Sequence, residues 1–93
     1  MKNHKEDFSV EKLEEAALAE AQAVISQAMK QAGLLQYELA HYLQVPPSAI
    51  SRMLNGKQNL TLKTFTRALI VCGFQPTFTI QPIEVSRLTE LER

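Results

Sequence analysis

Residues 36–56 read QYELAHYLQVPPSAISRMLNG, and the rest of the chain is organised around this stretch. It first places Leu39, Ala40 and Leu43 on one face, which is the spacing that a short amphipathic helix needs. A pair of prolines then marks a second helix start, because a proline in the first turn gives up an amide that has no intrahelical partner. The stretch therefore predicts two short helices joined by a break of about three to four residues.

The predicted second helix, residues 47–54, has two different faces. Ala40 of the first helix is small enough for the second to cross it closely, at roughly a right angle. Val45 is expected to fill the angle between them. The inward positions of the second helix are Ile50, Met53 and Leu54, and the outward ones are Ser48, Ala49, Ser51 and Arg52.

The outward face of this helix is nearly smooth, with short side chains and a single arginine. Such a face fits a DNA major groove about 12 Å wide, where the arginine could donate to O6 and N7 of a guanine. Gln36 begins the first helix, where free backbone amides and a side-chain amide can together hold a phosphate group. The alternative is a helical hairpin that only packs within an all-α domain.

A set of residues across this stretch shares its type and order with a known family: Gly33, Gln36, Glu38, Leu39, Ala40, Val45, Ser48, Ala49, Ile50, Ser51, Arg52, Asn55 and Gly56. The run resembles Xre-type (Cro/cI-like) helix-turn-helix domains over about residues 24–73, roughly half of the chain. The resemblance implies a lambda-repressor-like bundle of four helices that binds double-stranded operator DNA. It also implies two groups of contacts, with Pro47, Ser48, Ala49 and Arg52 on bases and Gln36, Ser51, Asn55 and Lys57 on the DNA backbone.

Three positions depart from the family pattern. Leu35 stands where a capping threonine is usual, and the loss of such a cap costs about 1 kcal/mol. Gln44 stands where glycine is usual, and a left-handed backbone there costs a non-glycine residue about 1 kcal/mol. The Pro46-Pro47 pair replaces polar residues that often contact DNA in the family, which shifts base recognition toward the outward residues that follow.

Composition limits the other classes of function. Ninety-three residues allow one domain, whose core buries about 60 to 70 percent of the unfolded surface, so dimerisation would add stability. The single cysteine, Cys72, excludes an intramolecular disulfide and a cysteine-based zinc site, and its place in an apolar helix predicts a small core residue. His4 and His41 are too few and too far apart for a metal site. We expect no metal, no cofactor, no membrane span and no signal peptide, and a soluble cytoplasmic protein.

Net charge is zero, but the charges are unevenly distributed. Residues 1–32 carry four lysines and six acids, a balance of −2, and residues 74–93 carry two arginines and three acids, a balance of −1. Residues 33–73 hold two lysines and two arginines against one glutamate, a balance of +3. Positive charge is thus concentrated on the expected DNA-binding module. With so few cations a single subunit should bind DNA weakly, so we expect two subunits on two half-sites.

The N-terminal third predicts one long helix. Residues 1–9 are polar and are predicted to be flexible, whereas residues 10–32 contain no proline or glycine and are rich in alanine, glutamate and glutamine. Gly33 suits the end of this helix. Its second half is expected to cover the two short helices through Ile25, Ala28, Met29 and Ala32. Its first half adds a stripe that either extends the core or forms a surface for a partner protein or second subunit, composed of Leu13, Ala17, Ala21 and Val24.

The chain beyond the two short helices predicts a loop and one more helix. An Asn-Gly pair is a turn signal, and in the family resemblance the loop with Lys57 lies along the DNA backbone. Thr61 caps a final core helix over residues 62–72, and a glycine stops it. The apolar positions of that helix are Leu62, Phe65, Leu69 and Ile70.

Residues 74–81 read FQPTFTIQ and alternate apolar with polar side chains, a period that predicts a β-strand. Because the chain offers no second strand, the expected partner is the same strand of a second subunit, antiparallel across a two-fold axis. Such a strand after the helical core resembles antitoxins of the HipB type, and more loosely HigA-like ones; an unpaired extended tail is the alternative. Residues 83–93 predict a tail or a short helix. The dimerisation segment, residues 74–82, would act through Phe74, Pro76, Phe78 and Ile80.

Together these features predict a mainly α-helical protein with one strand that acts as a homodimeric transcriptional repressor. The strand resemblance suggests an antitoxin of a type II toxin-antitoxin system, which represses its own operon and neutralises a toxin protein. Catalysis is not expected, because no nucleophile-base pair, phosphate loop or paired carboxylates are visible in the sequence. Two alternatives stay open: a stand-alone phage or plasmid regulator, and a protein-interaction module that has lost DNA binding.

Overall fold

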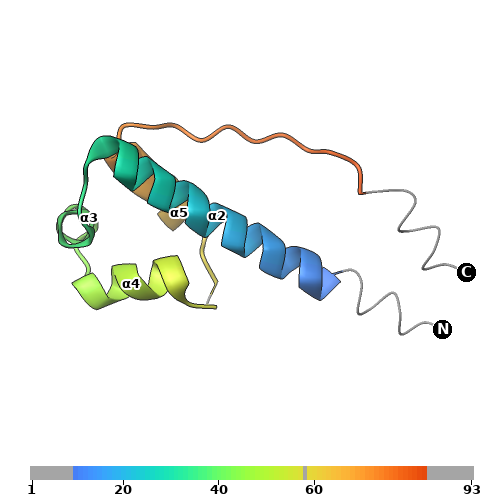
Figure 1. Cartoon of the computed structure of the whole chain (residues 1–93), viewed down its shortest axis with the longest axis horizontal. Coiled ribbons are helices and arrows are strands. Elements are labelled where there is room, and N and C mark those ends of the chain that lie inside the picture. The colour runs from blue at the N-terminus through green and yellow to red at the C-terminus, as the bar shows by residue number, and fades with distance from the viewer. Residues whose placement is uncertain (1–9, 58, 84–93) are drawn as a thin grey trace, which may run out of the picture.

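The computed structural model describes residues 10–57 and 59–83, and this part of the chain folds into four α-helices (Figure 1). They are α2 (Val10–Ala32), α3 (Gln36–Leu43), α4 (Pro47–Asn55) and α5 (Leu62–Val71). Both α2 and α3 pack against α4 and α5. The predicted order of helices is confirmed, whereas the predictions for residues 1–9 and 84–93 lie outside the described residues. None of the described helices is apolar over the length that a bilayer requires.

Three of the helices end in the same pattern of backbone hydrogen bonds. After α2, Gly33 takes the left-handed conformation at φ 68°, and the amide of Leu34 donates to the carbonyl oxygen of Met29 at 2.9 Å. After α5, Gly73 takes it at φ 94°. After α3, the left-handed residue is Gln44 at φ 61°. In this Schellman arrangement the backbone itself satisfies the last carbonyl groups of each helix.

The hydrophobic core lies where the second half of α2 meets the three shorter helices. Its largest fully buried side chains are Ile25, Leu39 and Ile50, one each from α2, α3 and α4. The prediction that Cys72 is a core residue is confirmed, and burial raises the pKa of its thiol above the ordinary value. The thiol therefore stays protonated and unreactive at neutral pH. The other buried side chains are Ala28, Met29, Ala40, Ala68 and Leu69.

Four side chains expected in the interior lie at the surface instead. Leu62, the first residue of α5, is exposed, and so is Ile70, which lies about 100° around the helix from its buried neighbour Leu69. The remaining two are Ala32, at the exposed end of α2, and Val45, which is 37% exposed at the rim of a crevice between α4 and α5.

The tail, residues 74–83, follows α5 without helix or strand and runs along α2 on the side away from α4 (Figure 1). The predicted strand is not formed within this single chain, because the described residues provide no second strand for its backbone groups. Phe78 nevertheless lies beside half-buried Phe65 of α5, with its ring centroid 6.5 Å from that of Phe65. Between the tail, α5 and α2 runs an apolar groove, here called the tail groove, whose lining includes Ala17, Ala21, Val24, Leu62, Phe65 and Phe78.

Candidate nucleic-acid interface

Helix α4 anchors one face in the core and presents the other to solvent. Ile50 is fully buried, and Met53 and Leu54 are half-buried against the core, which confirms the predicted inward side. The prediction that Ala49 faces outward is only partly right, because its side chain is half-buried in the crevice between α4 and α5. The outward side of α4, which is expected to contact DNA, is here called the reading face. Its exposed residues are Pro47, Ser48, Ser51 and Arg52.

The two prolines start α4 as the sequence predicts. Pro46 precedes the helix at φ −66°, and Pro47 is its first residue. The amide of Ala49 donates to the carbonyl oxygen of Pro46 at 2.9 Å, which closes the first turn. This helix start has no side-chain cap, Pro47 has no amide proton and the amide of Ala49 is already bonded, so the amide of Ser48 is the one left for an external acceptor in these first three positions of α4.

The turn between α3 and α4 depends on Gln44. Its backbone lies at φ 61° and ψ 47°, which is the left-handed region expected from the family pattern, where glycine is usual at this position. The amide of Val45 donates to the carbonyl oxygen of Ala40 at 3.0 Å, and that of Gln44 donates to His41 at 3.2 Å. These bonds complete the same helix end that glycine completes elsewhere in the chain. The turn therefore forms with a glutamine, at the strain of a left-handed non-glycine residue.

The start of α3 carries Gln36 exposed at its first position. Leu35 precedes the helix and offers no side-chain acceptor, as the sequence predicts. Glu38 reduces this loss, because its Oε1 accepts a hydrogen bond from the amide of Leu35 at 2.8 Å. One half of a capping box is thus present, and it holds the entry of the chain into α3 in place.

The C-terminal end of α4 is fixed by side chains from two helices. Asn55 donates from Nδ2 to the carbonyl oxygen of Ser51 at 3.0 Å, so part of this predicted backbone-binding side chain is turned along its own helix. Gln22 of α2 donates from Nε2 to the carbonyl oxygens of Met53 at 2.9 Å and Gly56 at 2.8 Å. Sequence reasoning missed Gln22; the available signal was a polar residue three positions before buried Ile25.

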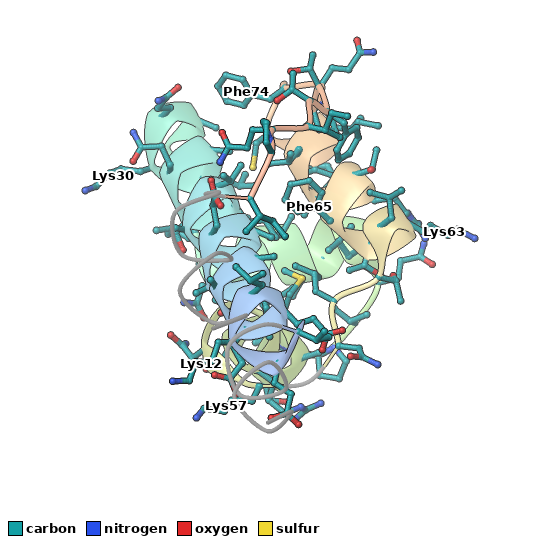
Figure 2. All side chains as sticks on the ribbon, turned by 90° about the vertical axis from the view of Figure 1, so that its right-hand side faces the viewer. Lys12, Lys30, Lys57, Lys63, Phe65 and Phe74 are labelled. Atoms are coloured by element: carbon teal, nitrogen blue, oxygen red, sulfur yellow. The ribbon has the colours of Figure 1, made fainter. Side chains whose placement is uncertain are left out.

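Further exposed basic side chains lie on the loop after α4 and on α5. Lys57 and Lys63 are exposed, and Figure 2 shows both projecting outward, one from the loop after α4 and one from α5. Arg67 of α5 was not among the predicted contacts, yet it lines the same crevice as Arg52. The positive charge of residues 33–73 is therefore carried by exposed side chains on α4, α5 and the loop between them.

A family model describes most of this architecture. The model of the helix-turn-helix family HTH_3 matches residues 25–78, more than half of the chain. The chain belongs to this helix-turn-helix family. Searches of the curated proteins and of the solved structures found no significant match.

Membership of the family makes this helix-turn-helix protein a DNA-binding transcription regulator of the Xre/Cro-like kind. The matched residues begin at Ile25, the first buried residue of α2, and include all of α3, α4 and α5. The first 15 residues of α2, 10–24, precede the match and are an addition to the family module. Gln22 and the stripe of Leu13, Ala17, Ala21 and Val24 lie in this segment.

The predicted dimerisation residues lie on the tail, far from the reading face of α4 (Figure 1). Pro76 is half-buried, Phe74 is partly exposed, Phe78 is 65% exposed and Ile80 is 99% exposed. The exposed fraction rises from Pro76 through Phe78 to Ile80. A single chain therefore leaves most of this apolar segment uncovered.

Proposed function

We propose that this helix-turn-helix protein is a sequence-specific transcriptional repressor that inserts α4 into the major groove of its operator. The observation that carries the proposal is the exposed polar face of α4 on a helix whose opposite face is anchored by buried Ile50. Arg52 and Ser48 read base edges, with Pro47 and Ala49 lying against the bases. Gln36, Ser51, Asn55 and Lys57 contact the DNA backbone.

Arg52 is the principal specificity residue of this proposal. Its side chain is the only cation of α4, and an arginine at this position can donate two hydrogen bonds to one guanine. Ser48 is one turn earlier on the same exposed face. Because Ala49 is half-buried, it contributes contact with a base at most through its exposed edge, and recognition rests mainly on Ser48 and Arg52.

High affinity for DNA requires two subunits. Each contact between a lysine or arginine and a DNA phosphate adds to the affinity. It also makes binding more sensitive to salt, because the logarithm of the binding constant falls by about 0.9 per contact for a tenfold rise in salt. Four cations on residues 33–73 give one subunit a small share of such contacts. A homodimer doubles them and places two copies of α4 on half-sites about one helical turn apart.

The tail is the proposed dimer contact. Its alternating apolar side chains and unpaired backbone suit an antiparallel strand pair with a second subunit. The tail and α4 lie on opposite sides of α2 (Figure 1), so a two-fold axis perpendicular to the strand pair leaves both α4 helices facing the same way. Both reading faces could then meet one side of a DNA duplex.

The proposed biological role is that of an antitoxin which represses its own operon and neutralises a toxin protein. Its support is the resemblance of the tail to HipB-like dimerisation segments, together with the N-terminal half of α2, whose Leu13 and Val24 are exposed beyond the family module. A stand-alone regulator has the same DNA-binding surface but no toxin gene beside it. In either role the protein represses transcription by occupying DNA, without catalysis or a cofactor.

A protein-interaction module without DNA binding is the second candidate. Its support is the zero net charge of the whole chain. Gln44 and the Pro46-Pro47 pair depart from the family pattern and would favour this module if they disrupted the fold, but Gln44 completes the turn and the prolines start α4 in place.

The experiment that tests the proposal is fluorescence anisotropy of the purified protein on its own upstream DNA and on a scrambled duplex. We expect Arg52→Ala to weaken binding to the upstream site by about 1 to 3 kcal/mol and to leave the scrambled duplex nearly unaffected. Lys30→Ala is the matched control, because it removes one exposed positive charge from the last turn of α2, outside the reading face of α4. Equal affinity of the wild type for both duplexes would overturn sequence-specific repression.

A further inference from the structure

Gln22 lies on α2 at the position where the helix passes from its exposed first half into the core. With Ile25 and Met29 it forms a stripe spaced i, i+3 and i+7, and the other two members of that stripe are buried. The Gln22 side chain is half-buried. Its two partners are carbonyl oxygens, so only the amide nitrogen can face them, and both of its protons are used.

These two bonds act on groups that α4 cannot satisfy by itself. The last four carbonyl groups of a helix lack intrahelical partners, and that of Met53 is one of them. Gly56 follows the last residue of α4, with its backbone at φ −82°, so its carbonyl group lies just beyond the helix end. Gln22 therefore caps α4 from a neighbouring helix, across 31 and 34 positions of sequence.

Gly56 is the other half of this arrangement. Its amide donates to the carbonyl oxygen of Arg52 at 2.6 Å, and a Cβ atom at position 56 would lie 2.6 Å from the same oxygen. Glycine is therefore required by close approach rather than by a left-handed backbone. The tight turn at Gly56 brings its own carbonyl group to Gln22 beside that of Met53.

We propose that Gln22 is a positioning residue which clamps the C-terminal end of α4 to α2 and thereby sets the specificity of DNA binding. The clamp fixes the inclination of α4, and with it the direction in which Arg52 leaves the last turn. Ile50 anchors the middle of α4 through non-directional apolar contact, whereas the two hydrogen bonds of Gln22 define one orientation. The inference rests on the proposed DNA-binding role, and Gln22 itself touches no DNA.

The test uses Gln22→Met in the full chain, which keeps the length of the side chain and removes both donors. Gln27→Met is the matched control, because Gln27 lies on the same helix, is exposed and faces the tail groove. We expect Gln22→Met to weaken binding to the upstream site about five- to thirtyfold, the equivalent of one or two hydrogen bonds. Affinity for a scrambled duplex should change less than twofold in both variants, because phosphate contacts tolerate small changes in helix orientation.

Amide hydrogen exchange provides a second measurement that does not involve DNA. The exchange rate at Gly56 reports opening of the end of α4, and we expect it to rise at least fivefold in Gln22→Met but not in Gln27→Met. Gln22→Glu keeps the size of the side chain but replaces the donor with an oxygen, so it should match or exceed the loss of specificity in Gln22→Met.

The outcomes separate the clamp from the DNA-binding role. Unchanged exchange at Gly56 in Gln22→Met would overturn the clamp itself. Faster exchange with an unchanged ratio of upstream to scrambled affinity would show that the clamp exists and does not set specificity, which also overturns the inference. If the wild type shows no preference for the upstream DNA, the proposed function and the specificity role fail together, while the exchange measurement still decides whether Gln22 holds α4.

Discussion

Two isoleucines of this protein have opposite environments. Ile25 on α2 is 0% exposed and lies at the centre of the helical core, whereas Ile80 on the tail is 99% exposed. Each belongs to a regular apolar pattern, with helical spacing around Ile25 and alternation around Ile80. The difference shows that a pattern identifies which positions are apolar, whereas burial depends on what lies beside them. For Ile25 that neighbour is the same chain; for the tail it is proposed to be a second subunit.

The core side of this comparison is tested by Ile25→Ala. Removing a fully buried isoleucine leaves a cavity, and we expect the free energy of unfolding to fall by about 2 to 5 kcal/mol. Urea denaturation measures the change. The matching substitution Ile80→Ala should alter the stability of the monomer by less than about 0.5 kcal/mol, because an exposed side chain has little contact to lose. Similar losses in both variants at concentrations where the protein is monomeric would contradict the contrast.

The tail side is tested by Phe78→Asp. In the proposed strand pair Phe78 faces the second subunit, and burial of an unpaired carboxylate there should dissociate the dimer. Sedimentation should show a monomer for this variant at concentrations where the wild type is a dimer. Gln81→Asp is the control, because it adds the same charge at an exposed position on the other side of the alternating pattern. A dimer that survives in Phe78→Asp would remove the tail from the interface.

The helices were predictable because their start and stop signals are local. Val10–Ala32 contains no proline or glycine and ends before Gly33, and the start of α5 is capped by Thr61, whose Oγ1 accepts a hydrogen bond from the amide of Thr64 at 3.1 Å. The predicted burial of single positions was less successful. Leu69 is buried as expected, but Leu62 and Ile70 are exposed, and the other buried positions are the small residues Ala68 and, at the C-cap of α5, Cys72.

The residues of the candidate site also fall into those that the sequence predicted and those that it did not. The outward positions of α4 followed from helical spacing, and Ser48, Ser51 and Arg52 are exposed. Gln22 did not follow, because its partners are backbone carbonyl groups, and a polar residue on the core side of a helix does not by itself show which carbonyl groups it reaches. Arg67 was missed because its place beside Arg52 depends on how α5 packs against α4. Sequence periodicity thus predicts the faces of single helices, and contacts between helices require the fold.

Among the main substitutions, the smallest effect is expected for Gln44→Gly. This substitution changes the helical part of the molecule and leaves the tail unchanged, so it tests whether the two regions respond independently. Glycine relieves the left-handed strain of about 1 to 2 kcal/mol at φ 61°. It also gives the unfolded chain more freedom, which offsets about 0.4 to 1 kcal/mol of the gain. We expect a net stabilisation of about 0.5 to 1 kcal/mol, seen as a rise in Tm of roughly 2 to 8 °C. The dimer dissociation constant should stay the same, because the tail lies on the other side of α2 from this turn; a lower Tm would mean that the glutamine side chain makes contacts that outweigh its backbone strain.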